Sequence, residues 1–211
     1  MGTQPRGAAF GSSPRIVRGD TLKAAAWKNG GGVTREIAAY PVGASLGTFV
    51  WRVSVADVER SGPFSSFPGI DRTLVLLAGA GMRLVEASGA THALLRPLAT
   101  ARFDGETALE AQLVEGATRD FNLMVRRDRA NATLEVWDGE GTHTLDADAA
   151  LVFCARGSLE FRLAREGAIP VPQAMQASLC ETDTLVLDAP RDLTCEVLGR
   201  GAALAVLLRY A

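Results

Sequence analysis

The amino-acid sequence predicts an all-β protein, and three observations lead to that prediction. Short segments of alternating polar and apolar residues recur along the 211 residues, at a spacing typical of sandwiches and barrels. β-Branched and aromatic residues are frequent inside these segments, and Gly, Pro, Asn or Asp bound them. Only residues 57–60 hint at a helix, and they make about one turn of it.

The candidate strands share this alternation and follow one another with short turns between them. A Gly-x-Gly at Gly79 and Gly81 joins two of them, so it is interpreted as a hairpin turn and not as a phosphate-binding loop. In order, the candidates are Arg15–Arg18, Val33–Tyr40, Thr48–Ala56, Thr73–Ala78, Met82–Glu86, Leu109–Glu115, Asp120–Arg127, Thr133–Asp138, Ala150–Ala155, Ser158–Leu163, Thr184–Asp188, Thr194–Leu198 and Ala203–Arg209.

Composition narrows the class of protein. Hydrophobic residues make up 47% and charged residues 22%, and 22 Lys and Arg face 24 Asp and Glu, which gives a net charge of −2. Without a block of like charge, neither nucleic acid nor a membrane surface is an expected partner. No apolar run reaches the roughly 18 residues of a membrane span. Residues 1–13 hold no apolar segment, so they are predicted to be a disordered leader and the protein to be cytoplasmic.

The three cysteines, Cys154, Cys180 and Cys195, are far apart and form no C-x-x-C pair. Each is predicted to be a small buried hydrophobe kept reduced in a cytoplasm, and the alternative is a nucleophile or a metal ligand.

The two halves of the chain share a sequence pattern, because LVLLAGAGMRL, which begins at Leu74, resembles LVFCARGSLEFRL, which begins at Leu151. Two β-barrels in tandem, with a seam between residues 105 and 145, are therefore predicted.

The most informative stretch is Trp27-Lys28-Asn29-Gly30-Gly31-Gly32. Successive glycines suit a place where the backbone approaches something closely or adopts a positive φ. An aromatic ring, a cation and an amide precede them, and Arg35 and Glu36 follow. This pattern predicts a small-molecule site whose ligand is an anion.

The order of several motifs resembles the HutD/Ves family. They are WKNGGGVTREI from Trp27, FVWRVSVA from Phe49, GPFSSFPGIDR from Gly62 and DFNLMVRR from Asp120. The resemblance implies a bicupin of two RmlC-like barrels. Residues 14–125 would form the N-terminal barrel, which holds the ligand site, and residues 126–211 would form the C-terminal barrel. Exchange of strands between the two barrels is left open. It also implies a role in bacterial histidine utilisation, through binding of an acidic intermediate such as formylglutamate.

The sequence gives little support for a metal site or for a Ser-His-Asp catalytic triad. Cupin metal sites use several histidines, whereas this chain has only His92 and His143, which are remote from each other and form no His-x-His. We therefore expect no metal and no cofactor, and neither histidine lies beside a candidate nucleophile. Carboxylates remain candidates for general acid–base work, namely Glu36, Asp71 and Asp120.

Strand alternation defines the candidate ligand site. Thr34 and Glu36 share one strand face, and Arg52 and Ser54 share the face that would look into a barrel. The predicted receivers of the anion are Lys28, the backbone amides of Gly30–Gly32 and Arg52. The full predicted ligand-binding set is Trp27, Lys28, Asn29, Gly30, Gly31, Thr34, Glu36, Arg52, Ser54 and Arg72, with Glu36 as general base if the protein is an enzyme.

Several structural alternatives stay open beside these roles. Trp27 is either a wall for the ligand or an apolar plug, and the Glu36–Arg52 pair either binds ligand or holds the strand register. Arg72 is expected at the mouth of the cavity. Asp120, Asn122, Met124 and Arg126 alternate on one face, which favours a domain interface or structural role over the barrel lining.

Three functions follow as hypotheses. The first is a metal-independent protein that binds a small carboxylate metabolite, as a monomer or a homodimer. The second is a metal-independent isomerase or hydrolase that uses a cavity carboxylate, and the third is a protein-binding module.

Overall fold

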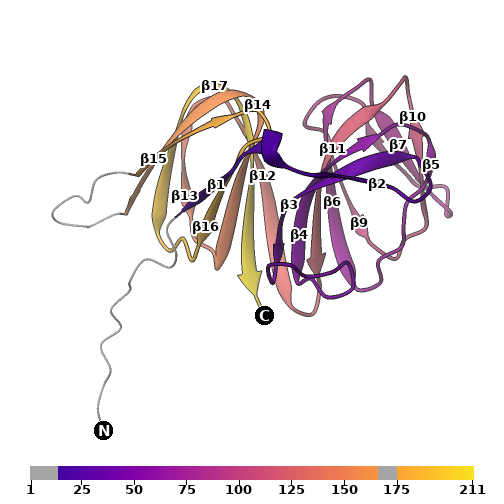
Figure 1. Ribbon diagram of the computed structural model, residues 1–211, viewed down its shortest axis with the longest axis horizontal. Helices are drawn as coiled ribbons and strands as arrows, with labels where there is room; N and C mark the ends of the chain where they lie inside the picture. The colour runs from indigo at the N-terminus through magenta and orange to yellow at the C-terminus, as the bar shows by residue number, and fades with distance from the viewer. Residues whose placement is uncertain (1–13, 166–174) are drawn as a thin grey trace, which may run out of the picture. The chain divides into compact units, whose positions relative to one another are not determined.

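The computed structural model describes residues 14–165 and 175–211, and within these ranges it contains β-strands, one short 3-10 helix (η1, Gly19–Thr21) and no α-helix (Figure 1). The all-β prediction is confirmed. The predicted leader, residues 1–13, lies outside the described residues.

The chain forms two compact units. The N-terminal unit contains Arg18–Leu134 with Tyr210 and Ala211, and the C-terminal unit contains residues 14–17 with the described part of Glu135–Arg209. The first strand belongs to the C-terminal unit because it pairs with Thr184–Val186, and Tyr210 belongs to the N-terminal unit because its hydroxyl accepts a hydrogen bond from Trp51 Nε1 at 3.2 Å. The predicted boundary between residues 125 and 126 falls inside the strand β11 (Thr118–Arg126), whereas the two units divide between Leu134 and Glu135.

The N-terminal unit consists of two antiparallel sheets. Its six-stranded sheet has the order β2 (Ala24–Ala26), β3 (Gly32–Tyr40), β4 (Trp51–Val58), β11 (Thr118–Arg126), β6 (Ile70–Ala78) and β9 (Thr100–Asp104). Its four-stranded sheet has the order β5 (Gly62–Pro63), β10 (Leu109–Leu113), β7 (Met82–Glu86) and β8 (Thr91–Leu94). The sheets are not joined into one closed sheet, so the unit is a two-sheet sandwich.

The core of the N-terminal unit lies between these two sheets. Val58, Leu74 and Leu76 from the larger sheet pack with Leu84 and Leu109 from the smaller one. Because side chains alternate along a strand, the residues of β4 with even numbers face this interior. Trp51, Val53 and Val55 are buried on the opposite face, so the predicted separation of the two faces of β4 is seen in the structure.

The C-terminal unit is built on one seven-stranded sheet. Its order is β1 (Arg15–Val17), β16 (Thr184–Asp188), β14 (Ala149–Arg165), β17 (Leu193–Tyr210) and β12 (Ala130–Asp138), with β13 (Gly141–Leu145) on β17 and β15 (Met175–Cys180) on β14. The register of β14 and β17 shifts at Cys154, close to Gly157, which has a φ of +79°. The long strands bend at such bulges, and the sheet encloses an apolar core that includes Val152, Phe161 and Leu187.

The structure corrects several details of the predicted elements. The segments predicted as Ala150–Ala155 and Ser158–Leu163 are one strand, since a bulge replaces the turn between them. The helix hint at residues 57–60 is wrong because Asp57 and Val58 end β4. Cys154 and Cys195 are buried as predicted, and burial raises the pKa of their thiols to about 11 and 12, but Cys180 is exposed.

Candidate functional site

A cavity of about 520 Å³ lies within the N-terminal unit. Strands β4, β6 and β11 contribute its polar wall, with Arg52, Arg72, Asp120 and Asn122. The β2–β3 turn contributes Trp27, Lys28 and Asn29, and the segment after β5 contributes Phe64 and Phe67. The cavity therefore combines charged groups on one wall with aromatic walls, which is the usual composition of a small-molecule site.

Strand register brings two arginines to the same level of the cavity. Met124 on the central strand β11 pairs with Arg52 on β4 and with Arg72 on β6. The two arginine side chains therefore project from strand positions on either side of Met124. The positive charge of each would lower the electrostatic energy of an anion bound between them. Asn122 lies two residues along β11, on the same face.

Arg72 is a buried cation that forms no ion pair with any of the described residues. The residue is only 8% exposed, and Nη2 donates to the Asn122 side-chain oxygen at 3.2 Å. The guanidinium carbon lies 5.1 Å from the ring centroids of Phe64 and Phe103 and 5.6 Å from that of Phe67. Nε has no hydrogen-bond partner among the described residues. Burial, helped by the charge of Arg52, lowers the pKa of Arg72 to about 10, so it stays charged at neutral pH.

Arg52, in contrast, already has an anionic partner. Its Nε donates to Glu36 Oε2 at 2.7 Å, and its Nη1 donates to the hydroxyl of Ser54 at 3.2 Å. The Arg52 side chain is 13% exposed and that of Glu36 is 44% exposed. Glu36 thus orients Arg52 from the solvent side, and neither Glu36 nor Ser54 lines the cavity.

Asp120 is a buried carboxyl group in the same cavity. It is fully buried, and its Oδ2 accepts a hydrogen bond from the Thr118 hydroxyl at 3.1 Å. Its Oδ1 has no hydrogen-bond partner among the described residues. Burial raises the pKa of Asp120 to about 7, the Thr118 hydrogen bond opposes this, and the charge of Asp57 adds to it.

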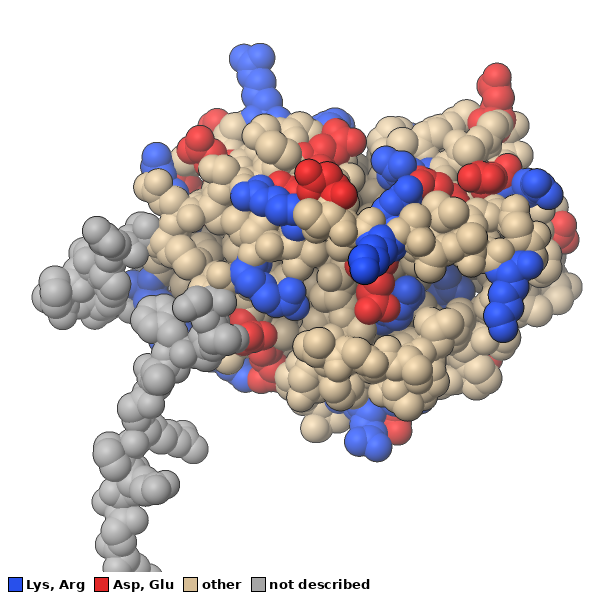
Figure 2. All heavy atoms as spheres, in the orientation of Figure 1, with Lys and Arg blue, Asp and Glu red and all other residues tan. Residues whose placement is uncertain are grey.

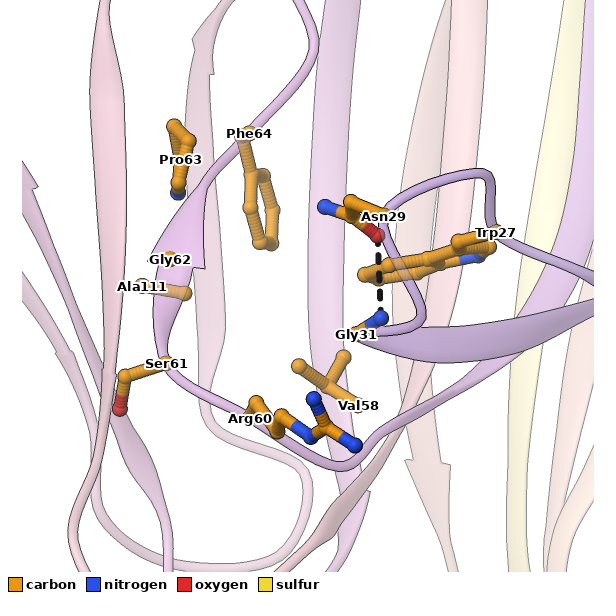
Figure 3. A pocket seen from close by; sticks show the side chains of 10 residues that line it. All are labelled: Trp27, Asn29, Gly31, Val58, Arg60, Ser61, Gly62, Pro63, Phe64 and Ala111. Carbon is orange, nitrogen blue, oxygen red and sulfur yellow. Dashed lines mark hydrogen bonds between the residues drawn. The ribbon is translucent and has the colours of Figure 1, made fainter.

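The glycine run shapes the turn between β2 and β3. Gly30 adopts a φ of +66° and donates its N–H to the Trp27 carbonyl at 3.0 Å. Gly31 donates to Asn29 Oδ1 at 3.0 Å, and Figure 3 shows the Asn29 amide nitrogen directed toward Phe64. A Cβ on Gly32 would lie 2.2 Å from the Asp57 carbonyl oxygen. The glycines therefore serve a tight turn and a close backbone approach.

The turn also forms a side compartment of the site. A hollow of about 110 Å³ shares Trp27, Asn29, Val58, Pro63 and Phe64 with the larger cavity (Figure 3). Trp27 is half-buried, and its Nε1 donates to the Thr34 hydroxyl at 2.7 Å. The indole is thus held in place by β3 and forms part of the wall.

The structure changes three of the predicted roles. The amides of Gly30 and Gly31 make hydrogen bonds within the turn, so they do not receive an anion here. Arg72 is a buried lining residue of the cavity, whereas a residue at the mouth would be exposed. Asp120, Asn122 and Met124 line the cavity, contrary to the favoured interface or structural role, because β11 is the centre of the sheet whose inner face bounds the cavity. Their alternation in the sequence was the available signal.

Of the predicted ligand-binding residues, the structure brings six together as lining of the larger cavity. These are Trp27, Lys28, Asn29, Thr34, Arg52 and Arg72. The others, Glu36, Ser54, Gly30 and Gly31, lie next to them as supporting residues. Asp71, the remaining candidate carboxylate, is an exposed partner of Arg127, with 2.7 Å between Oδ1 and Nε.

The described residues contain no cluster of three or more His, Cys, Asp or Glu arranged to hold a metal ion. His92 Nε2 lies 2.9 Å from Glu86 Oε1. His143 stacks on Trp137 with ring centroids 3.9 Å apart, and its burial lowers its pKa. Both histidines thus have partners on the strand that precedes theirs in the sequence.

On the face shown in Figure 2, acidic and basic side chains are interspersed and no large area carries one sign of charge. Many charged side chains of the described residues form ion pairs, for example Arg127 with Asp71, Asp104 and Glu106. No helix among the described residues has the length and apolar character needed to cross a membrane.

Comparison with known proteins agrees with this architecture. The HutD family model matches residues 19–205. The chain belongs to the HutD family. An uncharacterised 21.2 kDa protein from the hutC 3′ region of Pseudomonas putida is 38% identical over 153 residues, which cover 72% of this chain and 80% of that protein. Protein Ves of Citrobacter koseri is 38% identical over 133 residues, 63% of this chain and 68% of its own.

Solved structures support the same assignment. HutD from Pseudomonas fluorescens SBW25 has a TM-score of 0.80 at 31% identity, covering 94% of this chain and 100% of that one. Oxalate decarboxylase from Lactobacillus farciminis has a TM-score of 0.60 at 8% identity, covering 96% and 87%, and so shares the fold alone. The predicted bicupin fold is confirmed, in a form whose sheets are not closed barrels. The chain is a cupin-like HutD family protein, of a family connected with histidine utilisation.

The close approach at Gly32 predicts a loss of stability on Gly32→Ala. The new methyl group would collide with the Asp57 backbone, which no side-chain rotation relieves. We expect the free energy of unfolding in urea to fall by about 1–3 kcal/mol. Gly62→Ala is the control, because a Cβ there meets nothing within 4 Å, and its change should stay within about 0.5 kcal/mol. Equal effects of the two variants would contradict the assigned role.

The buried Asp120 predicts a pH dependence of stability. Its folded pKa of about 7 lies above the ordinary 3.8, so between these values the folded protein holds a proton that the unfolded chain releases. The contribution of Asp120 to the free energy of unfolding is therefore complete below about pH 4. It decreases as the pH rises to about 7, by up to about 1.4 kcal/mol per pH unit. Urea unfolding from pH 5 to 7 should show this decline in the wild type and lose it in Asp120→Asn. Parallel pH curves for both proteins would contradict the prediction.

Proposed function

We propose that this HutD family protein binds a small carboxylate metabolite in the cavity of its N-terminal unit. The observation that carries the proposal is Arg72, a cation in an apolar setting without an ionic partner among the described residues. A buried charge is costly unless it is paired. An anion that enters the cavity would supply the missing partner, and Arg52 at the same level would reinforce it.

The aromatic wall supports the same proposal. Phe64, Phe67 and Phe103 surround the guanidinium carbon of Arg72 and keep water from it, which strengthens its attraction for an anion. The planar fork of arginine also suits a carboxylate, because two N–H groups can donate to its two oxygens. Lys28 and Asn29, from the β2–β3 turn, would help to orient the rest of the molecule.

The family suggests which acid to test and where the protein acts. Formylglutamate, an acidic intermediate of histidine utilisation, is the favoured candidate. Binding it would allow the protein to moderate the pathway in the cytoplasm, in a sequestering or regulatory role that requires no metal.

The test is ligand-dependent stabilisation of wild type and Arg72→Met. Formylglutamate, glutamate and urocanate are compared by thermal shift and calorimetry, and an acid at 100 times its Kd should stabilise the wild type by about 2.7 kcal/mol. In Arg72→Met the apolar side chain keeps its contacts with the phenylalanines, but the affinity should fall at least tenfold, because a charged hydrogen bond contributes about 1.5–3 kcal/mol.

Arg127→Met is the matched control, since Arg127 carries the same charge on the surface and should leave the affinity unchanged. Arg72→Met should also be no less stable than wild type without ligand, because it removes an unpaired buried charge. No stabilisation by any acid, or equal affinities in wild type and Arg72→Met, would refute the proposal.

A second candidate function is acid–base catalysis, and Asp120 favours it. A carboxyl group with a pKa of about 7 is suited to exchange a proton at neutral pH. Glu36 is the poorer candidate, because it is paired with Arg52 outside the cavity lining. If the protein is an enzyme, turnover of the bound acid should disappear in Asp120→Asn while binding persists. Unchanged turnover in this variant would exclude Asp120 as the base.

A further inference from the structure

The cavity wall changes in chemical character along the central strand β11. Met124 lies at the level of the two arginines, Asn122 comes next on the same face, and Asp120 follows. Nη2 of Arg72 reaches the level of Asn122, because it donates to the Asn122 side chain at 3.2 Å. The wall thus runs from cationic to neutral to acidic.

Strand geometry sets the spacing of these groups. A strand advances about 3.3 Å per residue, so the Cα positions of Asn122 and Asp120 are roughly 7 Å apart. A ligand carboxylate at the Arg72 guanidinium therefore leaves room for only a few bonds before the molecule reaches Asp120. The cavity of about 520 Å³ is large enough for a ligand of this length.

Asp120 lacks a donor for one of its oxygens. Thr118 donates to Oδ2, while Oδ1 is buried in the cavity wall without a partner among the described residues. The other charged residues that line the cavity are Arg52 on β4, Arg72 on β6 and Lys28 in the β2–β3 turn, and the charge that acts on the Asp120 carboxyl is that of Asp57 on β4. No ion pair joins any of these three cations to Asp120 among the described residues. A buried acceptor without a donor is unfavourable, so the position suits a ligand that brings one.

We propose that the cavity selects acids that also carry an N–H group, with Arg72 and Arg52 binding the carboxylate and Asp120 Oδ1 accepting the N–H. This inference rests on the proposed function and specifies its ligand class. N-acyl amino acids, amino acids and imidazole acids belong to the class, and plain carboxylic acids do not.

Charge explains why the selection is strong. A ligand that offers only acceptor oxygens would place an oxygen lone pair next to the Asp120 carboxylate. Either the ligand oxygen or the carboxylate would then have to take up a proton. A ligand N–H meets the ionised carboxylate directly and needs no proton. A site built to hydrogen-bond a substrate N–H discriminates strongly against an analogue that lacks it.

The experiment compares ligand pairs that differ in one atom. N-Formylglutamate is paired with 2-formyloxyglutarate, in which an ester oxygen replaces the N–H, and N-acetylglycine is paired with acetoxyacetate. Affinities are measured by calorimetry at pH 7.5 in two buffers of different ionisation heat, which also gives the number of protons taken up. In the wild type we expect each amide to bind at least tenfold more tightly than its ester, and only the ester to bind with proton uptake.

Variants of Asp120 link this preference to the residue. Asp120→Leu removes the acceptor in a similar volume, and the amide and ester should then bind within about threefold of each other. Asp120→Asn keeps a neutral acceptor, so it should show an intermediate preference for the amide, without proton uptake on ester binding. This variant tests the proposal even if Asp120→Leu folds poorly. Asp71→Asn, the same change at an exposed aspartate of β6, should behave as wild type.

The outcomes separate the two proposals. Amides and esters that bind equally to the wild type, or a preference that survives in both Asp120 variants, would overturn the ligand class and leave acid binding intact. Binding of neither amide to the wild type would overturn both. A preference that decreases from wild type through Asp120→Asn to Asp120→Leu would support the proposal.

Discussion

The buried charge of Arg72 is the interaction on which the candidate site depends. Its guanidinium lies among three phenylalanine rings, with one neutral hydrogen-bond partner in Asn122. Aromatic faces stabilise a cation only in part, and they also exclude the water that would otherwise solvate it. The arrangement therefore costs stability in the free protein, and an anion in the cavity would offset that cost. A core optimised for stability alone would use an apolar residue at this position.

The rest of the N-terminal unit positions this charge. β11 occupies the centre of the six-stranded sheet, so its register aligns Arg52 and Arg72 on either side of Met124. Glu36 holds Arg52 from the solvent side, and the glycine turn brings Trp27 and Asn29 to the opposite wall. Gly32 allows this turn to lie against the end of β4, where a side chain would not fit. The conspicuous glycine run thus acts through shape. Lys28 of the same turn lines the cavity, and the charged groups of Arg52, Arg72 and Asp120 come from strands.

Asp120 gives the cavity its second chemical property. Its burial favours the neutral form, whereas a nearby ligand N–H would favour the ionised one, so the protonation state of the group is open to control by the ligand. A carboxyl group of this kind serves binding selectivity or proton transfer equally well. The fold itself does not choose between these roles, because cupin-like units serve many functions.

The sequence by itself determined the fold class, since alternation with period two and frequent turn residues favour strands wherever they occur. It also singled out residues that the structure brings together, because Trp27, Lys28, Asn29, Thr34, Arg52 and Arg72 all line the cavity of the candidate site. Only the tertiary structure decided which residues act together. The burial of Arg72, and the lack of a partner for Asp120 Oδ1 among the described residues, depend on register between strands far apart in the chain. The hydrogen bonds of the Gly30 and Gly31 amides depend on the conformation of the turn. The pattern within one strand shows that two side chains share a face, but not what packs against that face.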